Sequence, residues 1–112
     1  MLDEQLLEQF LELLGPTGVE EMYATFADNI GGYIDHLQNV VAKRNEEDTR
    51  RQAHQIKGAC RSVGLSQLAK PMEHVECDAW QWDEIDDLLE QWVLEVPLHQ
   101  HQLKRWLKIR AV

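Results

Sequence analysis

The sequence predicts an all-α protein: an antiparallel up-down four-helix bundle with a short extra N-terminal helix. Apolar residues recur every three or four positions through nearly the whole chain, the spacing that gathers them on one face of a helix. No stretch alternates apolar and polar residues long enough to form a strand, and no Asn-Gly or Asp-Gly hairpin turn occurs. Short connections between long amphipathic segments favour antiparallel neighbours.

The first two predicted helices are separated by a Gly-Pro step. One apolar stripe covers residues 2–14, and Gly15-Pro16 ends it because proline cannot continue a helix. Thr17 followed by Glu20 is a capping-box pattern, which predicts that the second helix opens there and carries its stripe over residues 19–41. Within this helix, Gly31-Gly32 indicates either a bend or a close approach of a neighbouring helix.

Three more helices follow, each with its own predicted cap. Asn45 with Asp48 predicts the start of the third helix, which runs to Gly64. Ser66 predicts the cap of the fourth, and Asp83 with Asp86 predicts the start of the fifth.

Two prolines complicate the last two helices. Pro71 removes a backbone donor inside the fourth helix, so this helix is expected to start late or to bend. Pro97 interrupts the fifth, which leaves residues 98–110 as either a kinked continuation or a separate short helix.

Length and composition predict one soluble domain over residues 1–112. The chain is 44% apolar and 28% charged, ordinary values for a globular protein. No apolar run approaches the roughly 20 residues of a membrane span, and the N-terminus lacks the pattern of a secretory signal. We therefore expect no membrane insertion, a cytoplasmic location, and reduced thiols at Cys60 and Cys77. We read Cys60 as a small core residue because it lies on the apolar stripe.

Charge is distributed unevenly. The net charge is −9, which argues against general binding of nucleic acid, because that binding is driven by cationic surface. Six of the eleven Lys and Arg residues nevertheless fall between positions 43 and 61. A local basic zone on an acidic protein predicts a defined site for an anionic group or an acidic partner.

A helical wheel places His54 on the solvent side of the third helix. At about 100° per residue, the apolar positions of this helix fall on the opposite side. Within about 60° of His54 lie a glycine and three cations. These neighbours are Arg50, Lys57, Gly58 and Arg61.

Each residue type on this face suits phosphoryl transfer. A neutral imidazole nitrogen is a competent nucleophile near pH 7, and Lys57 can reach the oxygens of a phosphoryl group. Gly58 costs about 1 kcal/mol relative to Ala within a helix, so its presence indicates that a partner must come close to the imidazole. An exposed histidine with a lysine three residues on is weak evidence alone, and the glycine strengthens it.

Other candidate sites are better explained by structure. His99-x-His101 does not predict a metal site, because side chains two apart on a helix diverge. Trp92 is expected in the core, while Trp80 and Trp82 are expected to be partly exposed. The basic segment after Lys104 is amphipathic, and we expect it to pack on the bundle rather than on a membrane.

The run from Ala53 to Ala59, with the residues after it, resembles the histidine phosphotransfer (HPt) domain family. That family's pattern is His-x-x-Lys-Gly, then a Gly at a helix end, then a Leu and a Glu in the next helix. The matching residues are His54, Lys57, Gly58, Gly64, Leu68 and Glu76. The resemblance implies a four-helix bundle in which His54 is phosphorylated and Lys57 and Gly58 shape its surroundings.

The resemblance also implies partners. We expect a monomeric phosphocarrier, not an enzyme, that accepts a phosphoryl group from a receiver-domain aspartate and passes it to a response regulator. Arg50, Gln55 and Arg61 are the expected docking residues. The chain itself should need no cofactor or metal, and the receiver should supply a divalent metal. Two alternatives stay open: the C-terminal HPt segment of a hybrid sensor histidine kinase, or a module that binds receivers without transfer.

Overall fold

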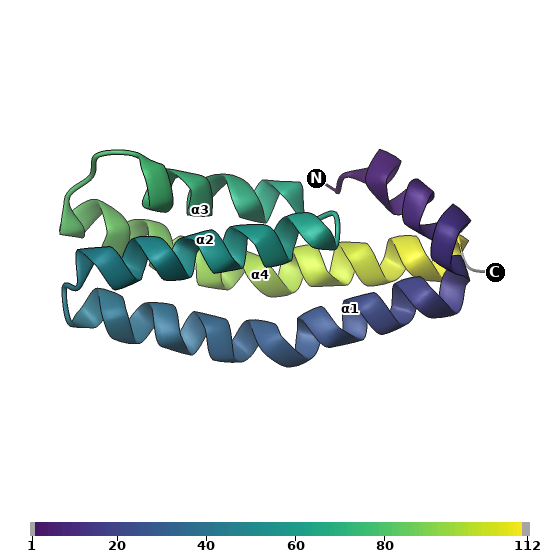
Figure 1. Cartoon of the computed structure of the whole chain (residues 1–112), viewed down its shortest axis with the longest axis horizontal. Helices are drawn as coiled ribbons and strands as arrows, with labels where there is room; N and C mark the ends of the chain where they lie inside the picture. Colours follow the sequence, from purple (N-terminus) through teal and green to yellow (C-terminus); the bar gives the residue numbers. More distant parts are fainter. Residues whose placement is uncertain (1, 111–112) are drawn as a thin grey trace.

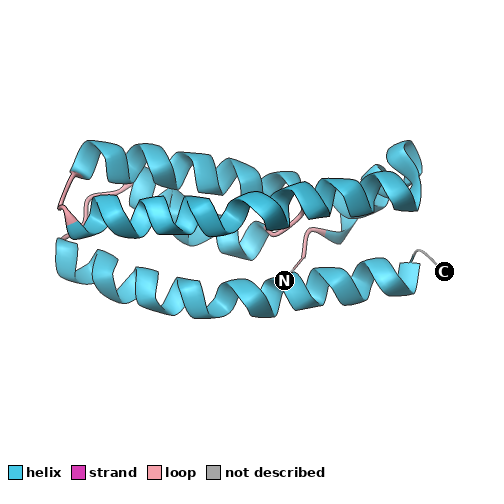
Figure 2. Cartoon of the chain, turned by 90° about the horizontal axis from the view of Figure 1, so that it is seen from below, coloured by secondary structure: helices cyan, strands magenta, loops and turns pink. Residues whose placement is uncertain are grey.

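The computed structural model describes residues 2–110, which form four helices. These are α1 (Glu4–Ala42), α2 (Glu46–Ser62), α3 (Ser66–Cys77) and α4 (Trp82–Arg110). They run alternately up and down along the long axis of the molecule (Figures 1 and 2). Over residues 2–110 there is no strand, and the predicted all-α bundle is confirmed.

A break at Gly15 turns the start of α1 into the predicted short N-terminal helix. Gly15 has φ 73° and ψ 171°, the only non-helical conformation within α1. The first part of the chain therefore folds back across one end of the bundle (Figure 1). The break lies two residues before Thr17, so the predicted capping box there is wrong in position. Pro16 explains the difference, because its fixed φ suits the first position of a helix.

The N-terminal helix is anchored on the turn between α2 and α3. Leu7 is fully buried, and the Asp3 N–H donates to the Gly64 carbonyl at 2.8 Å. Gly64 has φ 76°, and a Cβ atom there would lie 2.8 Å from Cγ of Leu7. Only glycine satisfies both the backbone conformation and the close approach at this position.

The predicted helix starts are confirmed to within a residue or two. The Asn45 side chain accepts from the Asp48 N–H at 3.0 Å, as predicted. Leu65, not Ser66, is the N-cap of α3. Helix α4 begins at Trp82, ahead of Asp83, and its first-turn acids are Asp83 and Glu84.

Neither proline breaks its helix. Helix α3 runs through Pro71 from its predicted start, and α4 runs through Pro97, so residues 98–110 continue the same helix. A Cβ atom at Gly31 or Gly32 would meet nothing within 4 Å, which excludes the close approach considered for this pair.

The core follows the apolar stripes of the four helices. Trp92 is almost fully buried, as predicted, and its Nε1–H donates to the Leu68 carbonyl at 2.9 Å. Cys60 is a buried core residue, and burial raises the pKa of its thiol to about 12. Cys77 is exposed at the end of α3. None of the helices described is both long and apolar enough to cross a membrane.

Candidate functional site

His54 stands on the solvent face of α2. Its side chain is 67% exposed, whereas Ala53, Ile56 and Cys60 on the other face of the helix are fully buried. The 3.6-residue repeat of the helix enforces this division, because burying the apolar residues turns His54 outward. The predicted orientation of His54 is confirmed.

A carboxylate from α3 holds one nitrogen of the imidazole. Nδ1 of His54 lies 2.7 Å from Oε2 of Glu76, and Nζ of Lys57 pairs with Oε1 of the same carboxylate. The hydrogen bond from Lys57 is the main reason that the pKa of Glu76 lies below its usual value. It outweighs desolvation, which raises this pKa, and the hydrogen bond with His54 lowers it further. Glu76 is therefore ionised at neutral pH and accepts a hydrogen bond from the imidazole.

This contact decides which imidazole nitrogen has a free lone pair. An ionised carboxylate can only accept, so a neutral His54 must carry its proton on Nδ1. Nε2 then has a lone pair, and within residues 2–110 no hydrogen bond engages it. The site thus presents an exposed imidazole with one nitrogen lone pair free.

The cations near His54 are less exposed than a helical wheel indicates. Only 12% of the Lys57 side chain is exposed, and its ammonium lies against Glu76 rather than in open solvent. The Arg50 side chain is 26% exposed and contacts α3. Arg61 remains exposed, and its Nη2 lies 3.5 Å from Oε2 of Glu73. A helical wheel shows no neighbouring helix, so it overestimates the exposure of Lys57 and Arg50.

Gly58 leaves the space beside His54 open. A Cβ atom at this position would meet nothing within 4 Å, and Gly58 is itself exposed. Gln55, the remaining predicted docking residue, is also exposed on α2. The surface around the imidazole is therefore accessible, as a site for another macromolecule requires.

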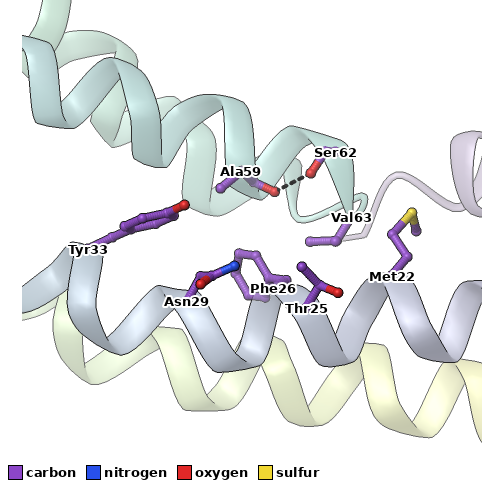
Figure 3. Close-up of a pocket in the computed structure, with 8 residues that line it drawn as sticks. All are labelled: Met22, Thr25, Phe26, Asn29, Tyr33, Ala59, Ser62 and Val63. Carbon is purple, nitrogen blue, oxygen red and sulfur yellow. Dashed lines mark hydrogen bonds between the residues drawn. The ribbon is translucent and has the colours of Figure 1, made fainter.

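Next to this face lies a shallow groove between α1 and α2. Its volume is about 340 Å³, and Figure 3 shows side chains of both helices along it. Ala59, the neighbour of Gly58, and Ser62 come from α2, and Phe26 and Tyr33 come from α1. The groove holds no second set of reactive groups.

The remaining histidines do not form a metal centre. His36 and His101 are exposed, and His99 is half-buried, with a pKa lowered mainly by desolvation. In the part of the chain that the structure describes, no three His, Cys, Asp or Glu residues are grouped to hold a metal ion.

Glu76 is the site residue to which residue-level reasoning gave no role. Nothing in the spacing of α2 and α3 reveals which acid of α3 faces His54, since Glu73 is also available. The only signal in the sequence is the Glu of the family pattern.

The chain is similar to known proteins over most of its length. The family model described as Hpt domain matches residues 21–106. Aerobic respiration control sensor protein ArcB from Escherichia coli and from Shigella flexneri is 31% identical over 115 residues, 96% of this chain. The chain spans only 14% of the length of those sensor proteins.

A solved structure is also similar over nearly the full chain. It is the histidine-containing phosphotransfer domain of ArcB from Escherichia coli, which superposes with a TM-score of 0.85 at 30% identity. The match covers 98% of this chain and 95% of that domain. The described fold, the exposed histidine and these matches lead to one conclusion: the chain belongs to the Hpt domain family and is a histidine phosphotransfer domain of a phosphorelay.

Proposed function

We propose that His54 is the phosphoryl acceptor of this domain and that Nε2 is the attacking atom. One observation carries the proposal: Glu76 engages Nδ1 at 2.7 Å, while the His54 side chain is 67% exposed and its Nε2 is unpaired among the described residues. A nucleophile that meets a phosphorylated receiver domain needs both a free lone pair and an open approach.

The transfer follows from this arrangement. The Nε2 lone pair attacks the phosphorus of an aspartyl phosphate on the receiver, and an N–P bond forms. The P–O bond to the aspartyl group breaks, and its electron pair leaves on the carboxylate. The imidazole keeps its proton on Nδ1 and becomes a cation, which the Glu76 carboxylate stabilises. Return of the phosphoryl group to a second receiver reverses these steps.

Lys57 and Gly58 support the same step in different ways. Lys57 fixes the Glu76 carboxylate and adds positive charge one turn from His54. Gly58 leaves room for the receiver. The proposed docking residues are Gln55 and Arg61, which are exposed on α2. Arg50, the third residue predicted to dock, is only 26% exposed because its guanidinium binds the end of α3. The receiver would contribute its own divalent metal, and this domain would act as a carrier with no turnover of its own.

The relatives favour one variant of this function. The ArcB relatives are sensor proteins, and the chain spans 14% of their length. This favours an HPt segment of a hybrid sensor histidine kinase, in which the phosphoryl donor lies on the same polypeptide. Residues 1–112 would form one domain in either case. The chemistry at His54 is the same for a tethered and a separate donor.

Transfer from a phosphorylated receiver domain tests the proposal. Wild type should acquire a label that is stable to alkali and labile to acid, and His54→Gln should acquire none. His74→Gln is the matched control and should be labelled at the wild-type rate. If His54→Gln is labelled, or if receivers bind wild type without labelling it, His54 is not the acceptor.

A further inference from the structure

We propose that Arg50 and Trp80 together hold the end of α3, an arrangement that we call the clasp, and thereby position Glu76. Arg50 and Trp80 then influence His54 through Glu76, without contacting His54 themselves. The inference rests on the proposed role of His54 and extends it to residues outside the reacting group. It gives Arg50 a different function from the docking role that its place on the α2 face predicts.

Arg50 binds the last turn of α3, where Glu76 lies. Its Nη1 donates to the carbonyls of Val75, Glu76 and Asp78, at 3.1, 2.9 and 2.9 Å. These groups have few partners of their own, because the last carbonyls of a helix have no N–H ahead of them. A cation there also opposes the negative end of the helix dipole. Arg50 thus ties the end of α3 to α2.

Trp80 completes the clasp from the loop between α3 and α4. The guanidinium carbon of Arg50 lies 4.6 Å from the centroid of the Trp80 ring, within cation–π range. The Nε1–H of Trp80 donates to the Val75 carbonyl at 2.9 Å, the same oxygen that Arg50 binds. Two side chains from different segments therefore hold the same backbone turn.

The clasp lies directly behind the site. Arg50 precedes His54 by one helical turn, so both sit on the same side of α2. Arg50 fixes the backbone of Glu76 through its carbonyl, and the Glu76 side chain fixes Nδ1 of His54. Without the clasp, Glu76 would be held only by Lys57 and by the packing of α3, and the proton on Nδ1 would be less well defined.

Two measurements separate positioning from docking. The first is labelling of His54 by phosphoramidate, a small donor that needs no docking surface. The second is the tautomer of His54 from its ¹⁵N chemical shifts, which requires no phosphorylation. Arg50→Gln should shift His54 toward the Nε2–H form that a free histidine side chain prefers. It should slow labelling by phosphoramidate roughly tenfold, the size expected for one charge-assisted hydrogen bond.

Matched variants guard against general loss of structure. Trp80→Phe keeps an aromatic ring to face Arg50 but removes the pyrrole part of the indole with its Nε1–H, so it should give a smaller shift in the same direction. Arg50→Lys keeps the charge and should recover part of the lost rate. Arg51→Gln is the control, because Arg51 is 69% exposed and, within residues 2–110, forms ion pairs only with Glu47 and Asp48 of its own helix. It should change neither measurement.

The outcomes are distinct. If Arg50→Gln slows transfer from a receiver but leaves the tautomer and phosphoramidate labelling unchanged, Arg50 is a docking residue and the clasp is overturned. If Arg50→Gln does not fold, the tautomer of His54 in the Trp80→Phe variant decides between positioning and docking in the same way. If wild type itself is never labelled, the proposed role of His54 fails, while the tautomer shift still tests the clasp.

Discussion

His54 and His74 lie on neighbouring helices, and both contact carboxylates, yet their surroundings differ in one decisive respect. His54 meets one carboxylate through one nitrogen. His74, at the end of α3, meets two: Nδ1 lies 2.7 Å from Oδ2 of Asp78, and Nε2 pairs with Glu84 at the start of α4. His74 is half-buried, whereas His54 stands open to solvent.

The comparison shows how carboxylates leave one nitrogen free in His54 and engage both nitrogens of His74. Two carboxylates favour the protonated imidazole, and the hydrogen bond with Asp78, followed by that with Glu84, raises the pKa of His74. Both ring nitrogens of His74 are engaged by carboxylates, so His74 joins α3 to α4 and offers no free lone pair to phosphorus. One carboxylate fixes the tautomer of His54 and leaves the opposite nitrogen free.

The largest predicted effect comes from closing the open side of His54. Gly58→Trp places a ring in the empty space beside the imidazole. Transfer from a receiver should fall at least about a hundredfold, because small misplacements of reacting groups already cost that much. Single-turnover transfer measures the effect.

Two controls separate access from folding at this position. Gly58→Trp should still be labelled by phosphoramidate, which is small enough to pass the ring. Gly58→Ala should raise the free energy of unfolding by about 1 kcal/mol, because a helix favours Ala over Gly. Full receiver transfer in Gly58→Trp would show that this side of His54 is not the approach.

A smaller effect is expected from Lys57→Met, which leaves the Glu76 carboxylate without its cation. Glu76 would be less firmly held against Nδ1, and local positive charge would be lost. Transfer should slow roughly ten- to hundredfold, the range for a hydrogen bond to a charged group. Lys70→Met, at an exposed lysine on α3, should transfer at the wild-type rate. Equal rates for the two variants would remove Lys57 from the site.

The smallest effect concerns His74 and the dependence of stability on pH. Its pKa is higher in the folded chain than the usual 6.5, so protonation favours folding. This stabilising contribution is complete below pH 6.5 and is lost as the pH rises through the pKa of His74 in the folded chain. Urea unfolding should show that the stability advantage of wild type over His74→Gln shrinks across that window. An advantage that grows with pH would contradict the assigned ion pairs.

The helices and their exposed faces could be predicted because they depend on local periodicity. The stripe of α2 placed His54 in solvent, and Asn45 marked the start of that helix. Details that depend on competition between neighbouring residues were less predictable. The break at Gly15-Pro16 was predicted, but the helix after it resumes directly behind Gly15 rather than at the Thr17 capping box. Helix α3 starts at Ser66 and continues through Pro71, so the late start considered there does not occur.

The candidate site was only half predictable for a related reason. His54 and Gly58 lie on one helix, so their relation follows from the sequence. Glu76 comes from α3, and its contact with His54 depends on how α3 packs on α2. Arg50 shows the same limit, because a wheel counts it as a surface cation while its guanidinium binds the end of the next helix.

The sequence by itself determined the helical class, the face that carries His54 and the residue types beside it, because these depend on spacing along one chain segment. Only the tertiary structure decided which imidazole nitrogen is free and which histidine is held by two acids. Those choices depend on side chains that meet across helices, over a few ångströms set by the packing of the core, and no periodicity within one helix encodes them.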